Sequence, residues 1–304
     1  MKIKDTKTPY VKRDSNEIFY DYSIYEPLMS FFYGRYGNIA RKYVFNYPIF
    51  SKALARYYKG KISRKIIPKF VKKYNIDVSE LEKSIDEYRT FNDFFIRKLK
   101  SGARKIDSNS LHGICPTDSK VLAFENTDIN YLFQIKGETF SLDKLLKGFV
   151  SSQDYEGGSY CIFRLTPQDY HRFHFIDDGN VIKGKTIKGK LYSVTPLSLQ
   201  KTKKLYVKSK KHLTLVDSKN FGEILYIEIG ASFIGSIIQT YEQMNEFAKG
   251  TEKGYFQFGG SAVLLFFKKG KIQIAEDLLK NTFMGYETEV KLGDFLGEKN
   301  SVSE

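Results

Sequence analysis

The segment from about residue 112 onward alternates short runs of β-branched and aromatic residues with glycines. The runs include SYCIFRLTP, EILYIEIGASFIGSIIQTY, YFQF, SAVLLFF and KIQIA. Such runs, bounded by turn residues, are typical of β-strands. Lys-Gly pairs at 183–184, 188–189 and 269–270 predict turns between them. The larger part of the chain is therefore predicted to be organised around β-sheet.

Helical signals come before this segment and interrupt it once. Residues 27–74 place apolar and aromatic residues at helical spacing among basic ones, which predicts two or three amphipathic helices. Capping patterns predict a helix over 79–88, another beginning after Thr90, and a short one over 141–148. We expect an α+β fold with two parts: a basic, amphipathic helical region over 1–76 and a β-rich catalytic body over 77–304.

The positive charge of the chain is concentrated at its N-terminal end. The whole chain has a net charge of +14, and residues 1–75 hold 17 Lys and Arg against 5 Asp and Glu. Basic amphipathic helices with aromatic residues suit the surface of an anionic bilayer, so we expect this region to bind membrane. A basic face packed on the rest of the protein and a nucleic-acid surface are the alternatives.

Other features bear on the compartment. The N-terminal stretch MKIKDTKTPYVKRDSNEIF has no apolar segment after its charged start, so no signal peptide is expected. No apolar run approaches the roughly 18–20 residues of a membrane-spanning helix. Cys115 and Cys161 form no CxxC pair, which favours a reducing compartment without a disulfide framework.

The stretch FGGSAVLLFF (258–267) sets two glycines and a serine against a strand of buried character. A tight bend before a core strand is the plainest explanation. The flanking Gly259 and Gly260 also leave the Ser261 hydroxyl approachable, which makes Ser261 a candidate nucleophile. It lacks the G-x-S-x-G pattern of a hydrolase nucleophile elbow, because Val263 stands in place of the last glycine.

Two of the four histidines, His171 and His174, lie three residues apart in LTPQDYHRFHFI. No Cys or Glu lies nearby at a familiar metal-ligand spacing, so acid–base work is favoured over a metal site. A histidine base needs a nucleophile and an orienting carboxylate. Asp118, in CPTDSKVLAF, is the candidate carboxylate, although an Asp in such a turn more often makes only local hydrogen bonds.

These motifs together resemble the phosphatidylserine decarboxylase family. YRTFNDFFIRKL with RKID, PTDS, TPQDYHRFH, GKLYSV, IEIGASFIGSI and GGSA follow one another in the family's order, from about residue 88 to 275. The resemblance implies that the chain cuts itself between Gly260 and Ser261, giving chains of residues 1–260 and 261–304. By resemblance, Asp118, His174 and Ser261 are the orienter, base and nucleophile of cleavage.

The resemblance also implies the later chemistry. Ser261 would become a pyruvoyl group, the electron sink for converting phosphatidylserine to phosphatidylethanolamine and CO₂, and no metal is expected. His171 would be the proton donor of that reaction. The implied partners are the lipid substrate, an anionic membrane and the two product chains, with no nucleic acid. A homodimer is a further assembly that this interpretation allows. The implied location is peripheral, on the cytoplasmic face of a bacterial cell membrane.

Two positions depart from the family's pattern. Ser119 replaces the usual glycine after the motif Asp, and Ala262 replaces the usual threonine after the cleavage serine. These departures keep open an unprocessed, non-catalytic relative that binds anionic membrane. A serine hydrolase that uses the same triad without cutting itself is a third hypothesis.

Overall fold

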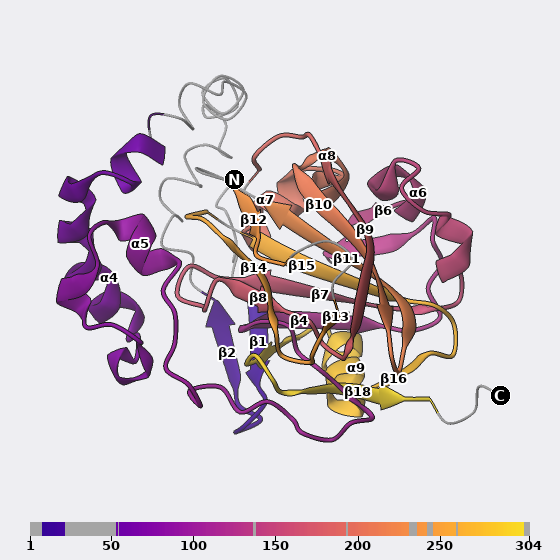
Figure 1. Cartoon of the computed structure of the whole chain (residues 1–304). Coiled ribbons are helices and arrows are strands. Elements are labelled where there is room, and N and C mark those ends of the chain that lie inside the picture. Colours follow the sequence, from indigo (N-terminus) through magenta and orange to yellow (C-terminus); the bar gives the residue numbers. More distant parts are fainter. Residues whose placement is uncertain are drawn as a thin grey trace.

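The large sheet of the protein carries the candidate site. The computed structural model describes residues 8–21, 53, 55–135, 138–192, 194–230, 236–241, 246–259 and 261–300. Ten of the described strands form one mixed sheet (Figure 1). In spatial order they are β13 (Glu246–Phe247), β9 (Gly179–Ile187), β10 (Lys211–Ser218), β11 (Gly222–Gly230), β15 (Ser261–Phe267), β7 (Ser159–Leu165), β4 (Ser119–Phe124), β17 (Glu287–Val290), β1 (Thr8–Lys12) and β2 (Ile18–Asp21).

Three smaller sheets accompany it. They are β12 (Ile237–Gln239), β14 (Glu252–Phe256) and β8 (Arg172–His174); β16 (Ile272–Ile274), β18 (Phe295–Lys299) and β3 (His112–Ile114); and β5 (Leu132–Ile135) with β6 (Glu138–Phe140). The described α-helices are α4 (Ile67–Tyr74), α5 (Phe91–Phe95), α6 (Leu142–Leu146), α7 (Pro196–Lys201), α8 (Leu205–Lys208) and α9 (Glu276–Phe283). The 3₁₀ turns are η1 (Lys61–Ile66), η2 (Val78–Glu80), η3 (Ile85–Glu87) and η4 (Ser152–Tyr155).

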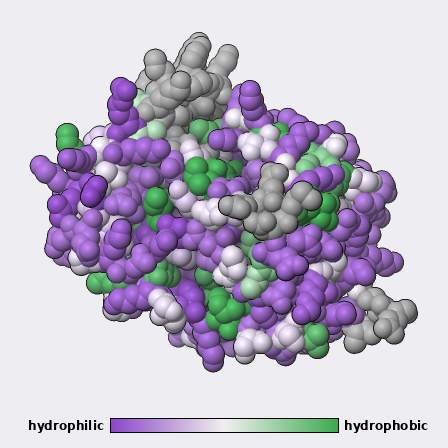
Figure 2. Space-filling model, in the orientation of Figure 1, coloured by the Kyte–Doolittle hydropathy of each residue, from purple (hydrophilic) through white to green (hydrophobic). Residues whose placement is uncertain are grey.

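Both faces of the large sheet are covered. All seven residues of β15 are buried, and successive side chains of a strand point to opposite faces. Val263, Leu265 and Phe267 belong to one apolar cluster, whereas Leu264 and Phe266 belong to another on the other face. The continuous apolar run SAVLLFF therefore reflects a central strand between two cores. The face in Figure 2 is mainly hydrophilic, with small apolar patches.

The predicted α+β class is confirmed, and each quoted strand run contains an observed strand. The helix predicted over 79–88 is wrong, because that stretch forms the two short turns η2 and η3. Its capping box lies at Ser84 and Glu87, too late to start a long helix. The turn predicted at Lys183-Gly184 is also wrong, because both residues lie inside β9. A side chain at Gly184 would crowd His212 and Tyr241, which explains a glycine there.

The N-terminal quarter contains an unpredicted element. Residues 8–21 form the hairpin β1–β2, and β1 pairs in parallel with β17 near the other end of the chain. Of the predicted helices over 27–74, η1 and α4 are observed, while residues 22–52 lie outside the described part. The boundary at residue 76 between the predicted basic helical region and the predicted catalytic body stays a prediction.

An aromatic cluster joins α4 and α5 to the large sheet. We call it the aromatic cap, and its buried members are Ile67, Phe70, Leu81, Tyr88, Phe91, Phe94, Phe95 and Phe258. Seven of these residues lie between 67 and 95, whereas Phe258 comes from the segment just before β15. The helical layer, at the left in Figure 1, is therefore packed directly on the entry to the central strand.

A buried ion pair connects β11 and β14. Lys253 Nζ lies 2.9 Å from a carboxylate oxygen of Glu228, and neither side chain is exposed. The ammonium also donates to Thr214 and Gln239. Because burial is costly for a charge, each member of this pair depends on the other.

Glu228→Gln is expected to lower the free energy of unfolding by about 3–5 kcal/mol, since it leaves the Lys253 charge buried without its carboxylate. The double variant Glu228→Met/Lys253→Met should lose less. Urea unfolding of both variants in a Ser261→Ala background measures the difference. A single variant as stable as the parent would contradict the argument.

Candidate active site

Ser261 is the first residue of the central strand β15. It lies opposite Leu165 of β7 and Gly230 of β11, and its side chain is buried. Two neighbouring ladders therefore hold the backbone that follows the Gly260–Ser261 bond. Because water is excluded, a reactive group at residue 261 would work in a site of low polarity.

The segment before this bond is held by the aromatic cap. The ring of Phe258 lies 4.2 Å from that of Tyr58 and about 5 Å from those of Phe91 and Phe95, measured between centroids. The Phe258 backbone N–H donates to the Asn92 side-chain oxygen at 3.0 Å. The chain is thus anchored two residues before Gly260 as well as immediately after it.

His171 contacts the Ser261 hydroxyl. Its Nδ1 lies 3.2 Å from Ser261 Oγ, and its Nε2 lies 3.1 Å from the Thr166 carbonyl oxygen. A carbonyl only accepts, so in the neutral ring Nε2 carries the proton and Nδ1 accepts from the serine. The arrangement is that of a base beside a nucleophile, with a backbone carbonyl holding the base in orientation.

Burial keeps the His171 ring neutral. The ring is fully buried and stacks on Phe95 with centroids 3.9 Å apart. Loss of solvation, assisted by the nearby Arg97 charge, lowers the pKa of His171 to about 3. The resting imidazole is therefore unprotonated throughout the physiological pH range.

His174 lies on β8, and its side chain is also buried. Its Nδ1 has no hydrogen-bond partner among the described residues. Burial lowers the pKa of His174 to about 4, and Glu252 and the Pro116 carbonyl oppose that shift. The ring is neutral and has one nitrogen available.

Asp118 is held in a different set of contacts. Arg104 donates to both carboxylate oxygens, at 2.9 Å from Nε and 2.6 Å from Nη2, and the Leu292 backbone N–H donates at 2.9 Å. Within the described part of the chain, neither histidine is among its hydrogen-bond partners. The structure thus brings His171 and Ser261 together, while Asp118 is joined to Arg104.

Several residues of the site carried no role in the sequence analysis. Phe95, Asn92 and Arg97 lie in FNDFFIRKL, whose resemblance to a family signature was the available signal. Thr166 acts through its carbonyl, which side-chain patterns cannot reveal.

Metal binding is the first alternative to chemistry at Ser261. The described residues include no group of three or more His, Cys, Asp or Glu that could hold a metal ion.

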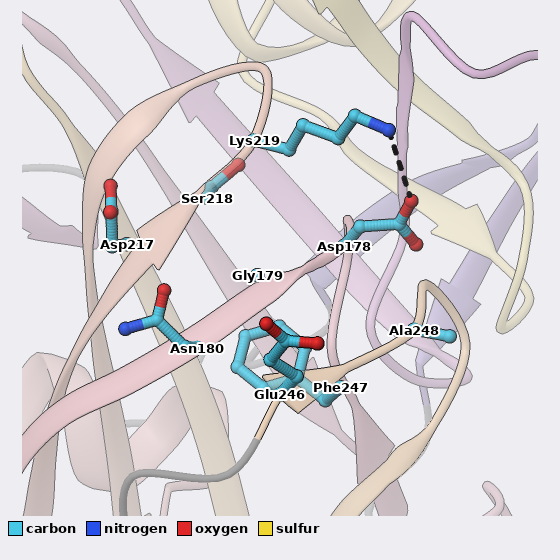
Figure 3. Close-up of a pocket in the computed structure, with 9 residues that line it drawn as sticks. All are labelled: Asp178, Gly179, Asn180, Asp217, Ser218, Lys219, Glu246, Phe247 and Ala248. Carbon is cyan, nitrogen blue, oxygen red and sulfur yellow. Dashed lines mark ion pairs between the residues drawn. The ribbon is translucent and has the colours of Figure 1, made fainter.

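A hollow of about 510 Å³ opens beside β9 and β13 (Figure 3), lined by Asp178, Asp217, Lys219 and Glu246 among others. None of the predicted site residues lines this hollow, so it is not part of the candidate active site around residue 261.

The chain is similar to known proteins over the residues that form this site. The family profile described as phosphatidylserine decarboxylase matches residues 91–298. The chain belongs to the phosphatidylserine decarboxylase family. It is 50% identical to a phosphatidylserine decarboxylase proenzyme of Clostridium tetani (strain Massachusetts / E88), over 82% of this chain and 84% of that protein.

Two further relatives of the family carry the same name. One, from Ruminiclostridium cellulolyticum, is 42% identical over 86% of this chain and 87% of its own length. The other, from Desulfitobacterium hafniense (strain Y51), is 48% identical over 79% of this chain and 80% of its own length. The word proenzyme in these names describes proteins that are processed to become active.

The two departures from the family's motifs fit the structure. Ser119 begins β4 with an ordinary negative φ, so no glycine is required there. Ala262 is fully buried and packs in an apolar cluster with Leu264 and Phe266. A methyl group at residue 262 suits this surrounding.

The buried histidines predict a pH dependence of stability. Their folded pKa values lie below the unfolded value of about 6.5, so the unfolded chain takes up protons first as pH falls. The stabilisation is complete above pH 6.5 and is lost progressively toward pH 4, by up to about 1.4 kcal/mol per pH unit for each histidine.

Urea unfolding of the Ser261→Ala chain between pH 4.5 and 7.5 measures this slope. His171→Gln in the same background should reduce it, because glutamine does not titrate. An unchanged slope would show that His171 is not held neutral by the fold.

Proposed function

We propose that this protein is a self-processing decarboxylase that converts phosphatidylserine to phosphatidylethanolamine and CO₂. The observation that carries the proposal is the 3.2 Å contact between His171 and the buried Ser261 hydroxyl, at the serine that follows Gly260 in a family of proenzymes. Cleavage of the Gly260–Ser261 bond would yield chains of residues 1–260 and 261–304.

In the cleavage step, the Ser261 hydroxyl loses its proton to a neutral imidazole as its oxygen attacks the Gly260 carbonyl carbon. The C–N bond between Gly260 and Ser261 then breaks, which leaves an ester between the two residues. β-Elimination breaks the Cβ–Oγ bond of residue 261 and releases residues 1–260 with a C-terminal carboxylate. The Phe258 anchor and the β15 ladder support this step, because they hold both sides of the bond while the nucleophile moves. Restricting the reacting groups in this way lowers the entropic part of the barrier.

The residues around position 261 fit a pyruvoyl group formed from Ser261. They bury that position, and His171 Nδ1 lies 3.2 Å from its side-chain oxygen. Bound covalently there, the group would supply an electron sink for decarboxylation. The chain's own residues would exclude water, orient the substrate and donate a proton.

The two histidines divide these tasks. We assign cleavage to His174, oriented by Asp118, and proton donation during decarboxylation to His171, following the family resemblance. The contact of His171 with the residue-261 side chain is compatible with its role, since the pyruvoyl group forms from that residue. The same contact would also let His171 serve as the cleavage base, and variants separate the two assignments.

Self-cleavage predicts two fragments on a denaturing gel, the smaller having the 44 residues of 261–304. Ser261→Ala should stay whole at 35.2 kDa and be inactive, because it has no attacking oxygen. The small wild-type fragment should react with a carbonyl reagent and have no free N-terminal amine. A whole, inactive wild type would favour a non-catalytic relative, and a whole chain with esterase activity would favour a hydrolase.

The histidine variants should fail at different steps. His174→Ala and Asp118→Ala should remain largely uncut. His171→Ala should be cut and carry the carbonyl group, yet turn over about 10²–10⁴ times more slowly, as expected when a general acid is lost. Gel analysis and CO₂ release measure the two steps. The reverse pattern would exchange the two histidine roles, and normal behaviour of both variants would refute them.

We further propose that the basic N-terminal region binds the anionic surface of a membrane, with the enzyme peripheral on its cytoplasmic face. In the described residues, α4 and η1 expose basic side chains while Ile67 and Phe70 pack inward. No helix in the described part of the chain is both long enough and apolar enough to cross a bilayer.

Replacing four exposed lysines by glutamine should weaken binding to anionic vesicles about 5-fold per lysine, and added salt should weaken the parent similarly. These lysines are Lys65, Lys69, Lys72 and Lys73. A control variant with the same charge change replaces Lys185, Lys188, Lys201 and Lys203. Equal loss in both variants, or equal parent binding to neutral vesicles, would contradict a specific membrane face.

A further inference from the structure

Arg97 is a buried cation with unused hydrogen-bond donors. It follows α5 in the chain, and only 4% of its surface is exposed. Its Nη2 donates to the carbonyls of Gln168 at 2.6 Å and Asp169 at 3.0 Å. Its Nε and Nη1 are buried and have no hydrogen-bond partner among the described residues. Leaving such donors unpaired is costly, which indicates a partner outside the protein.

The neighbouring carboxylates do not neutralise this charge. Arg97 forms no ion pair within the described part of the chain, whereas Asp118 is paired with Arg104 and Asp169 with Lys120. A buried charge without a counter-ion is strongly destabilising. Arg97 is therefore the cation here whose charge is available to an anionic ligand.

Arg97 is one of the residues that line a cavity of about 150 Å³. The cavity lies between the end of α4, η2 and the loop over 168–170. Two other carboxylates line it, but Glu80 is paired with Arg104 and Asp77 accepts from the Ser79 N–H. At about 30 Å³ per water, the space would hold roughly five water molecules, enough for a small oxyanion.

One wall of this cavity is continuous in sequence with His171. Its lining residues Gln168, Asp169 and Tyr170 lead directly into His171. The charge of Arg97 is close enough to lower the pKa of His171. A ligand bound at Arg97 would therefore lie beside the segment that presents His171 to residue 261.

We propose that Arg97 forms an oxyanion subsite for the phosphodiester of the substrate headgroup, an inference that rests on the proposed function. The phosphodiester is separated from the reacting serine group by only a few bonds. A small rotation of the buried guanidinium would turn its two free donors to the phosphate oxygens, since guanidinium matches their geometry.

Reaction chemistry distinguishes the phosphodiester from the substrate carboxylate. The carboxylate loses its charge as CO₂ leaves, so a cation bound to it would stabilise the ground state and oppose the reaction. The phosphodiester stays anionic throughout. A cation bound to it stabilises substrate and transition state equally, and this affects KM rather than kcat.

The kinetic test uses a water-soluble, short-chain phosphatidylserine. Arg97→Met should raise KM about 10- to 100-fold, the loss expected for charge-assisted hydrogen bonds, with kcat changed less than about 3-fold. Arg97→Lys should have a KM between that of the parent and that of Arg97→Met. Arg89→Met is the control, since Arg89 is an exposed arginine nearby, and it should behave as the parent.

Two competitive inhibitors test which oxyanion of the substrate, the phosphodiester or the carboxylate, binds Arg97. Glycerophosphoethanolamine carries the phosphodiester without a carboxylate, and an O-alkylserine carries the carboxylate without a phosphodiester. Arg97→Met should weaken inhibition by the first compound only. Weaker inhibition by the O-alkylserine alone, or a fall in kcat at unchanged KM, would overturn the phosphodiester assignment.

A binding measurement separates this inference from the proposed function. Inorganic phosphate should raise the Tm of the uncut Ser261→Ala chain, and it should not do so when Arg97→Met is added. Equal stabilisation of both chains, with wild-type decarboxylation intact, would overturn the subsite alone. Phosphate stabilisation that needs Arg97, in a wild type without decarboxylase activity, would overturn the proposed function alone.

Discussion

The pairing of β15 between β7 and β11 is the constraint on which the candidate site depends. The ladder begins at Ser261 itself, so the candidate nucleophile is also the first residue of a central strand. A nucleophile placed there cannot move with a flexible loop. The groups around it come from other elements: His171, at the end of the 166–171 loop, contacts its hydroxyl, and Phe95 of α5 packs on that histidine.

The helical part of the chain contributes to the site through α5. Asn92 and Phe95 lie on this one short helix, and the first holds the Phe258 backbone while the second packs on the His171 ring. α5 therefore links the segment before the Gly260–Ser261 bond with the histidine that contacts Ser261. A five-residue helix can do this because Thr90 caps it and the aromatic cap buries nearly all of it.

The sequence predicted what depends on local pattern and failed where distant segments meet. The strand of residues 261–267, the serine that begins it and the histidine pair are each visible within ten residues. The contact of His171 with Ser261 spans 90 positions, and the parallel pairing of Tyr10 with Glu287 spans almost the whole chain. Arg97 carried no signal of its own in the sequence, because only the fold shows that its side chain is buried and that two of its donors are unpaired. The predicted helix at 79–88 failed because the capping box of this stretch lies at Ser84 and Glu87 and begins only the short turn η3.

The position of β17 gives the proposed cut chain an unusual architecture. β15 lies between two strands of the longer fragment, and β17 lies between β4 and β1 of that same fragment. The short fragment would thus be interwoven with the long one at two places in a single sheet. Two separately made fragments would each have to leave gaps in that sheet for the other to fill. Assembly from one continuous chain, with the cut made last, avoids this difficulty, and the nicked protein would be held together much like an intact one.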